Sequence, residues 1–330
     1  MKGFTAGTLA VALWVVHAIA GTAQASAPLA VRWQSGAQDC DATPPPPLQV
    51  HRPAGTTFLL RQNPCSSFEA NFLYLLVGKE RALLIDSGAV ADPARMPLAA
   101  TVMDLLPRTD GARLPLLVAH THSHSDHREG DAQFAGLDGV EIVPPDAEGV
   151  RRHYGFDRWP DGVARIDLGG RVVHVLPAPG HNDNHVVFFD ETTGLLFSGD
   201  FLLPGRITVD DTAVFEASAK RIAAFVSGRP LSHVLGGHVE LDAAGALYPM
   251  GSTFHPDERR LELDKADVLA LPAALASFNG FHSRHANFVI THPMHNLLAL
   301  GACVAMALAL LAWACVRMLR RRRAKRSVAP

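Results

Sequence analysis

The chain has 330 residues, 48% of them apolar, which is enough for one large domain or two ordinary ones with a sizeable core. Its formal net charge is −2 at pH 7, so it lacks the overall positive charge that attracts nucleic acid, and no nucleic-acid partner is expected. Several of its 17 histidines lie in short clusters beside acidic residues, a pattern that raises the question of metal binding.

The N-terminus has the composition of a secretory signal peptide. Lys2 precedes an apolar run over residues 9–19, and the small-residue sequence Ala23-Gln24-Ala25 is typical of a cleavage site. These features predict a signal peptide over residues 1–25 that is removed on export; an uncleaved N-terminal anchor is the alternative. Residues 26–55, which include four consecutive prolines, lack hydrophobic periodicity and are predicted to form an extended leader over the domain surface.

Residues 56–250 show alternating strand and helix patterns. The apolar runs Phe72–Val77 and Ala82–Ile85, joined by a polar turn, predict a β-hairpin. A helix is expected over Met96–Leu106, and a buried strand over Leu114–Ala119 leads into a loop at His120–His127. A second helix is predicted at Val214–Val226, and further strands at Val140–Val143, Val172–Leu176, Val186–Phe189, Gly194–Phe197 and His233–Leu235. The pattern indicates an α/β domain in which helices cover β-sheets.

The C-terminal part has the pattern of a membrane anchor. Residues 251–296 are predicted to add a helical extension and a spacer. The uninterrupted apolar stretch 297–316 has the length of a transmembrane helix, and seven basic residues follow it within the tail 317–330. Because basic flanks stay in the cytoplasm, we predict a single-pass protein of the cytoplasmic membrane whose main domain faces the periplasm or the cell exterior.

The four cysteines fall into two pairs. Cys303 and Cys315 lie inside the predicted span, whereas Cys40 and Cys65 belong to the exported part, where an oxidising compartment would allow a disulfide between them. No C-x-x-C spacing is present, which argues against a cysteine zinc knuckle or a thioredoxin-like site. All four cysteines are therefore interpreted as structural.

A histidine-rich string closes the buried strand at Leu114–Ala119. In Thr121–His127, His122 and His124 can point from a tight loop toward one ion, while Asp126 and His127 turn toward a neighbouring one. Imidazole and carboxylate donors suit Zn²⁺, and also Fe or Mn. A solvent-exposed polar loop is the alternative for such a string alone. Three more possible donors follow later predicted strands: His181, Asp200 and His238.

With these residues in place, the chain resembles the metallo-β-lactamase superfamily over about residues 55–245. The motifs that carry the resemblance are Ile85-Asp86-Ser87-Gly88, Thr121–His127, Pro179-Gly180-His181, Ser198-Gly199-Asp200 and Gly236-Gly237-His238. The resemblance implies an αββα sandwich with a two-metal site at one edge of the packed sheets.

The resemblance also assigns a role to each donor. It implies a first metal held by His122, His124 and His181, a second held by Asp126, His127 and His238, and Asp200 as a bridge between them. Asp86 is similar to the family's acid that orients the metal loop through hydrogen bonds. A surface turn acid is the alternative for Asp86. His120 and His185 lie near the motifs but are not assigned as ligands.

The implied activity is hydrolysis of a small molecule by a metal-bound hydroxide shared between two divalent ions, with zinc as the preferred metal. Asp126, besides its ligand role, is the candidate to guide the attacking water or take its proton. The fold does not choose the substrate, so a lactam, lactone, ester, thioester or phosphoester outside the cytoplasmic membrane remains open. The alternatives are an iron-dependent oxidoreductase on the same scaffold and a non-catalytic, anchored metal-binding module.

Overall fold

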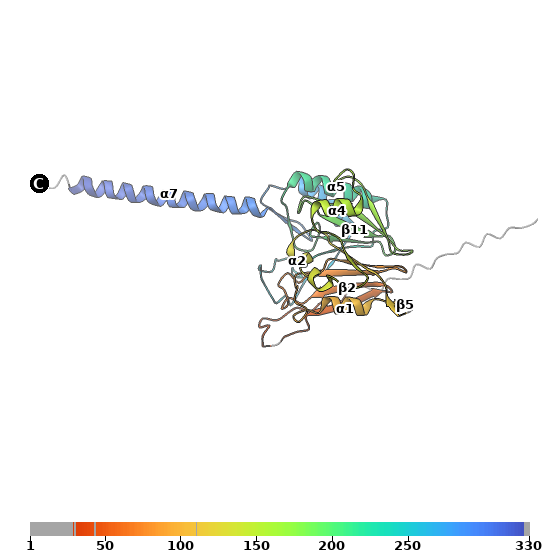
Figure 1. Cartoon of the computed structure of the whole chain (residues 1–330). Coiled ribbons are helices and arrows are strands. Elements are labelled where there is room, and N and C mark those ends of the chain that lie inside the picture. Colours follow the sequence, from red (N-terminus) through yellow and green to blue (C-terminus); the bar gives the residue numbers. More distant parts are fainter. Residues whose placement is uncertain (1–28, 30, 43, 110, 327–330) are drawn as a thin grey trace, which may run out of the picture.

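The computed structural model describes residues 29, 31–42, 44–109 and 111–326. The predicted signal peptide, residues 1–25, lies outside the described residues. Two six-stranded sheets form the centre of the domain (Figure 1). The first has the order β1 (Leu48–Ala54), β2 (Thr57–Gln62), β3 (Phe72–Val77), β4 (Ala82–Ile85), β7 (Leu116–Ala119), β8 (Val140–Ile142). The second has the order β15 (Glu262–Leu263), β14 (His233–Gly236), β12 (Leu195–Gly199), β11 (Val186–Asp190), β10 (Val172–Pro177), β9 (Ala164–Asp167).

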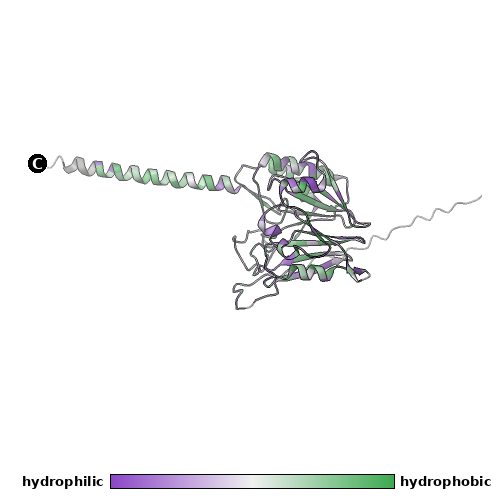
Figure 2. Ribbon diagram, in the orientation of Figure 1, coloured by the Kyte–Doolittle hydropathy of each residue, from purple (hydrophilic) through white to green (hydrophobic). Residues whose placement is uncertain are grey.

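The core lies between the sheets and on their outer faces. Along β3, Tyr74 and Leu76 point to the inner cluster that also holds Phe188 and Phe197 of the second sheet, because successive side chains of a strand face opposite sides. Leu73 and Leu75 point outward instead. All of these residues are buried, and Figure 2 shows the apolar strands enclosed between the layers.

Helices cover the outer face of each sheet. On the first sheet lie α1 (Leu98–Leu105) and α3 (Asp131–Phe134), and on the second lie α5 (Thr212–Ser227) and α6 (Lys265–Ala276). Helix α5 buries Phe215, Ile222 and Val226, three residues at helical spacing, and Asp211 caps its N-terminus by accepting a hydrogen bond from the Val214 amide. The predicted αββα sandwich is confirmed.

Several elements were absent from the sequence prediction. Strand β1 lies within residues 26–55, where an extended leader was expected, and β2 follows it. Helix α4 (Ala147–Tyr154) and edge strand β9 were also not predicted. Each is short and contains few apolar residues, and eight or four positions are too few for a periodic pattern to stand out in the sequence. Two short strands, β5 (Arg108–Thr109) and β6 (Ala112–Arg113), form a separate hairpin.

The region 251–296 is more strand-rich than the expected helical extension. It contains β15, α6, β16 (His282–Arg284) and β17 (Val289–Thr291). Strands β16 and β17 join β13 (Arg206–Thr208) in a small sheet of order β13-β17-β16. Sequence alone does not reveal this sheet, because β13 and β17 are far apart in the chain and each has only three residues.

The C-terminal helix α7 (Pro293–Arg326) extends away from the domain (Figure 1). Its segment Pro293–Arg320 has a mean hydropathy of 2.4 over its most apolar window and is not buried within the structure, so by length and composition it could cross a membrane. In Figure 2 most of this helix has the green colour of hydrophobic residues. Cys303 and Cys315 lie on this helix as free thiols.

The predicted disulfide between Cys40 and Cys65 is present, with Cα atoms 5.5 Å apart. It ties the segment before β1 to the loop after β2. That loop leads directly to Glu69 and Asn71, so the crosslink lies a few residues from the cluster of polar side chains described next.

Candidate metal centre

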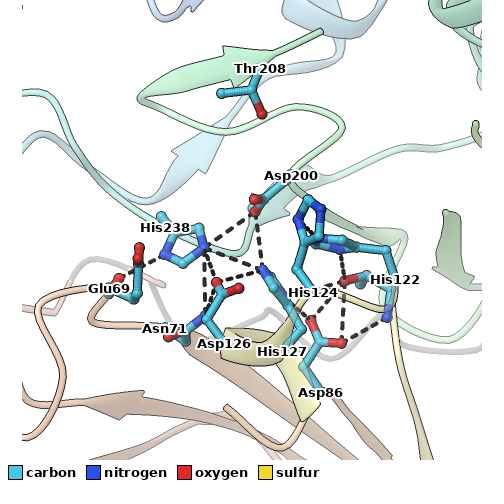
Figure 3. A network of polar contacts seen from close by, with 12 residues as sticks. Glu69, Asn71, Asp86, His122, His124, Asp126, His127, Asp200, Thr208 and His238 are labelled. Carbon is cyan, nitrogen blue, oxygen red and sulfur yellow. Dashed lines mark hydrogen bonds and ion pairs between the residues drawn. The ribbon is translucent and has the colours of Figure 1, made fainter. Parts of the chain in front are cut away.

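The polar motifs meet at one edge of the sandwich. Strand β4 pairs in parallel with β7, and β12 pairs in parallel with β14, so the carboxyl ends of these strands lie at common edges. The residues that follow them are Asp86 after β4, the His122–His127 string after β7, Asp200 after β12 and His238 after β14. His181 joins them from the connection between β10 and β11. The two sheets thus contribute to one cluster (Figure 3).

The predicted loop ends earlier than expected. Ser125–Arg128 form one helical turn, α2, in which the His127 amide donates to the His124 carbonyl at 3.1 Å. Four residues are too few to show helical periodicity in a sequence. The turn brings Asp126 and His127 into the cluster, where the His127 ring lies beside that of His122, with centroids 4.1 Å apart (Figure 3).

Three ring nitrogens converge in the first group of donors. His122 Nε2 lies 2.9 Å from His124 Nδ1, and His181 Nε2 lies 3.2 Å from each of these two atoms. His122 and His181 are buried, whereas His124 is exposed. Three imidazoles that turn their nitrogens toward one another without an acceptor between them have the geometry expected around a cation.

The second group joins a carboxylate to two histidines. Asp126 Oδ2 lies 3.2 Å from His127 Nε2 and 3.3 Å from His238 Nε2, and the two ring nitrogens are 3.3 Å apart. All three atoms fall within one possible coordination sphere. The donor set of two imidazoles and one carboxylate is suited to Zn²⁺, Fe or Mn.

Asp200 faces both groups. Its Oδ1 lies 3.4 Å from His127 Nε2 and 3.3 Å from His238 Nε2, while its Oδ2 lies 3.5 Å from His181 Nε2. Oδ1 is buried and accepts no hydrogen bond among the described residues. An unpaired buried carboxylate oxygen is costly, and a cation on each side would satisfy both oxygens.

Backbone and carboxylate acceptors fix the orientation of the rings. His181 Nδ1 donates to the Thr208 carbonyl at 2.9 Å, and His238 Nδ1 donates to the Glu69 carbonyl at 2.7 Å. A proton held at Nδ1 leaves the Nε2 lone pair of each ring directed into the cluster. Thr208 Oγ1 also lies 2.7 Å from His181 Nδ1.

Asp86 contacts the histidine string through Thr121 and His127 and fixes its orientation. Its Oδ1 accepts from the Thr121 amide at 2.7 Å, and its Oδ2 lies 2.9 Å from His127 Nδ1. The backbone of Asp86 has a φ of 62°, and its side chain is buried. The alternative of a surface turn acid is therefore wrong, and the contacts fit the orienting role expected for this residue.

The two donor groups differ in how their surroundings shift the pKa values of their side chains. Burial and the neighbouring histidines hold the pKa of His122 well below its usual value. Burial also acts to lower the pKa of His238, but Asp200 and Asp126 outweigh it and raise that pKa to about 10. Burial raises the pKa of Asp200, yet the facing histidines bring it below its ordinary range. A cation would take over the role of the protons that the second group otherwise keeps.

Other residues at the site were not predicted. Asn71 Nδ2 donates to Asp126 Oδ2 at 3.2 Å, and Glu69 and Thr208 act through the contacts given above. Asn71 directly precedes a predicted strand, but an asparagine there carries no specific signal. His185 is fully buried and stacks on His122 with ring centroids 4.9 Å apart, without joining a donor group.

Two histidines near the motifs lie outside the cluster. His120 Nε2 lies 2.8 Å from Asp131 Oδ1 and forms no part of the donor groups. His255 is buried against Glu258, with Nδ1 2.8 Å from Oε1, and stacks on Tyr248. Neither ring contacts the donors.

A groove of about 760 Å³ adjoins the first group of donors. Ser123 and Asn182, neighbours of the ligand candidates, form part of its wall, together with Arg128, Pro145, Asp146, Ala147, Asp183, Asn184, Asp210 and Asp211. Among the described residues that line it, four are acidic and Arg128 is the basic one. The groove therefore presents a net negative charge beside the cluster.

Sequence comparisons relate the chain to hydrolases. A hydroxyacylglutathione hydrolase from Dechloromonas aromatica is 28% identical over 212 residues, which cover 63% of this chain and 71% of the relative. An acyl-coenzyme A thioesterase from Homo sapiens is 26% identical over 219 residues, covering 55% and 77% respectively. Among solved structures, a metallo-β-lactamase from Pontibacter korlensis has a TM-score of 0.46 at 16% identity, covering 70% of this chain and all of that one.

The family model of the metallo-β-lactamase superfamily matches residues 68–277. The matched range runs from the loop before β3 through α6 and includes each of the donor residues in Figure 3. Superfamily and relatives together support a metal-dependent hydrolase in general. The chain belongs to the metallo-β-lactamase superfamily.

Proposed function

We propose that this protein is a dinuclear-metal hydrolase. His122, His124 and His181 would hold the first ion, and Asp126, His127 and His238 the second. The observation that carries the proposal is the position of Asp200, whose two carboxylate oxygens face different donor groups. Zinc is the preferred metal, with Fe or Mn as alternatives.

Two divalent ions held by these residues would lower the pKa of bound water toward 7 and polarise the substrate oxygen. The chain's own residues position the reactants. Asn71 donates to Asp126 Oδ2, which also faces His127 and His238, so the contacts of Asp126 are made through one oxygen. Oδ1 is then the atom that guides the attacking water and accepts its proton, and Asp126 is only partly buried, which gives water access.

The substrate proposed here is a thioester or ester. The relatives named above are a glutathione-thioester hydrolase and an acyl-coenzyme A thioesterase, which favours acyl transfer to water among the open classes. The acidic groove beside His124 and His181 disfavours leaving groups that carry carboxylates or phosphates. A neutral or cationic leaving group is therefore the better electrostatic match.

Helix α7 is proposed as a single-pass anchor in the cytoplasmic membrane, with the metal domain on the periplasmic or outer side. The support is the apolar segment Pro293–Arg320 together with the basic residues that follow it. Protease added to intact spheroplasts should release an active domain fragment. Protection of the domain, with digestion of the basic tail, would reverse the orientation.

The test of the activity uses the full chain in detergent, loaded with zinc, against thioester, lactone, lactam and phosphodiester probes. Thioester hydrolysis at about two zinc ions per chain is expected, and it should fall on the order of a hundredfold or more in Asp126→Asn. Full turnover in Asp126→Asn with both ions bound would remove the proton-transfer role. Inactivity across the probes would favour a non-catalytic module, and stoichiometric iron with oxygen uptake would favour an oxidoreductase.

A further inference from the structure

We propose that the candidate metal centre opens toward the lipid surface, and that its substrate is an amphiphilic acyl thioester or ester held in the bilayer. The inference rests on the proposed hydrolase activity and on α7 as an anchor. It follows from how the root of α7, residues 293–296, is joined to the site.

One ladder of backbone pairs connects the donor cluster to the anchor. His181 is held by Thr208, at the end of β13, and Thr208 is the parallel partner of Thr291 at the end of β17. The Val209 amide donates to the Thr291 carbonyl at 2.9 Å, which continues the pairing by one residue. Thr291 therefore lies one strand spacing, roughly 5 Å, from Thr208, which holds a donor histidine, and α7 begins two residues later, at Pro293.

The root of α7 is fixed to the domain by side-chain contacts. Asn296 Nδ2 donates to the Phe281 carbonyl and lies within reach of Thr291 Oγ1, both at 3.1 Å, and His295 Nδ1 donates to the Gly280 carbonyl at 2.9 Å. These bonds tie the first turn to the β16–β17 hairpin. Figure 1 shows α7 leaving the domain at the edge where α2 lies and pointing away from it. A bilayer crossed by α7 would therefore face the edge that carries the donors.

Exposed apolar side chains lie on this edge. Phe68, 45% exposed, adjoins Glu69, whose carbonyl holds His238, and Met250, 80% exposed, lines the same small cavity as Phe68. Beside the root of α7, Phe281 and Met294 are also exposed. Scattered exposed apolar residues are ordinary, but two of these adjoin the loop that holds His238 and two adjoin the start of α7, where they suit contact with lipid headgroups and acyl chains.

The chemistry needs little movement of such a substrate. Water adds through its oxygen to the acyl carbon, the carbon–sulfur bond breaks, and the thiol takes up a proton, giving a fatty acid and a free thiol. The acyl chain can stay in the leaflet while its carbonyl rises to the donors. Anchoring enzyme and substrate in one surface raises their effective concentration relative to each other.

The first experiment tests whether the edge of the domain that carries the donor cluster lies at the lipid surface. The full chain, with Cys303→Ser and Cys315→Ser, is reconstituted in phosphatidylcholine vesicles and labelled with a fluorophore at Met250→Cys. Lys79→Cys is the matched control, because Lys79 lies in the exposed turn between β3 and β4, at the end of β4 opposite Asp86. Nitroxide-bearing lipid should quench the label at position 250 and not at position 79. Equal quenching at both positions, or none at either, would overturn the orientation.

The second experiment measures whether the orientation of the domain on the bilayer affects catalysis. The zinc-loaded chain in vesicles is given S-palmitoyl-N-acetylcysteamine in the bilayer and S-acetyl-N-acetylcysteamine in solution. A flexible glycine-serine linker inserted between Asn296 and Leu297 should lower turnover of the palmitoyl thioester by about tenfold or more, because it frees the domain from its fixed orientation. Turnover of the acetyl thioester should not change, which shows that the linker variant folds and binds metal.

The outcomes distinguish failure of the lipid-facing site, of the hydrolase activity and of the membrane anchor. Hydrolysis of the acetyl thioester with an unchanged palmitoyl rate in the linker variant would overturn the lipid-facing site and leave the hydrolase intact. Failure to cleave either thioester, with zinc bound, would overturn the hydrolase and the inference together. A chain that does not float with the vesicles would overturn the anchor.

Discussion

Two clusters of buried charge lie at opposite ends of β11, and they differ in how their polar atoms are satisfied. At the far end, Arg171 donates from Nη2 to Asp190 at 2.7 Å and to Thr57 Oγ1 at 2.7 Å, and from Nη1 to the Thr56 carbonyl at 2.9 Å. Asp190 also accepts from its own turn, at Thr193 Oγ1. At the other end, next to Val186, the metal-donor cluster sets nitrogen against nitrogen and leaves Asp200 Oδ1 without a hydrogen bond.

A structural buried cluster satisfies its own polar atoms, whereas a functional one leaves some of them for a ligand. In the Arg171 cluster, opposite charges pair and neighbouring oxygens accept the remaining protons, so nothing further is needed. In the donor cluster, the three histidines of the first group set nitrogen against nitrogen, and Asp200 Oδ1 accepts no hydrogen bond from the described residues, so these atoms are left for cations. The first cluster should matter for stability and the second for metal content and activity.

The largest effect is expected at the bridge. Asp200→Asn removes the charge that faces both groups while keeping the shape of the side chain, so bound metal should fall below two ions per chain and kcat/KM should drop by about a thousandfold or more. Elemental analysis and thioester kinetics measure both. Asp138→Asn, in an exposed turn, is the matched control and should behave as the unaltered chain. Two tightly held ions and normal kinetics in Asp200→Asn would refute the bridging role.

At the cluster of Arg171 and Asp190, the expected effect is a loss of stability instead. Arg171→Met leaves Asp190 buried without its partner and should lower the free energy of unfolding by about 3–5 kcal/mol, while metal content and turnover per folded molecule stay the same. Thermal and urea unfolding measure the loss. The double variant Arg171→Met with Asp190→Leu should regain much of it, since no unpaired charge remains. An equal loss in single and double variants would contradict this explanation.

A smaller effect is expected at Asp86, which acts through His127 and Thr121. Asp86→Asn weakens their orientation and should reduce metal affinity or activity by about 10–100-fold. Zinc titration against a chelating dye measures the affinity. If the variant lost only thermal stability and kept its affinity for zinc, Asp86 would be a structural residue of the turn and not an orienting one.

The smallest effect, counted per pH unit, is a graded dependence of zinc affinity on pH. The metal-free form keeps a proton on His238, whose pKa is raised to about 10 by Asp200 and Asp126. Its stabilising pairs are complete below the ordinary histidine pKa of about 6.5 and are lost as pH rises through about 10. Zinc must displace that proton, so zinc affinity should rise about tenfold per pH unit between about pH 6 and 8 for each proton released. A flat profile would show that the ring is already neutral.

Sequence patterns predicted much of the site because its donors occur in short motifs at the ends of apolar strands. The assignments of His122, His181 and Asp200 needed only those motifs and the resemblance they carry. Glu69 and Thr208 could not be predicted, because each acts through a backbone carbonyl, which any residue possesses. The pairing of Arg171 with Asp190 was also not predicted, since nothing in a single sequence shows which charges become buried.

In the fold, too, features set by local sequence were predicted and features set by distant contacts were not. Strands β3 and β4 were predicted at their observed bounds, because continuous apolar runs are flanked by polar turns. The small sheet of β13, β17 and β16 was not predicted, because it depends on contacts between distant segments and not on local propensity. It is this non-local sheet that joins the donor cluster to the root of α7.

The division of the donors between the two sheets has a consequence for metal supply. His122 and His127 come from the first sheet, whereas His181, Asp200 and His238 come from the second. Neither ion has its full set of ligands until both sheets have folded and packed. If the chain is exported before it folds, as the proposed topology implies, it would acquire metal only after translocation. The metal supply of the outer compartment, more than the intrinsic preference of the ligands, would then decide which ion it carries.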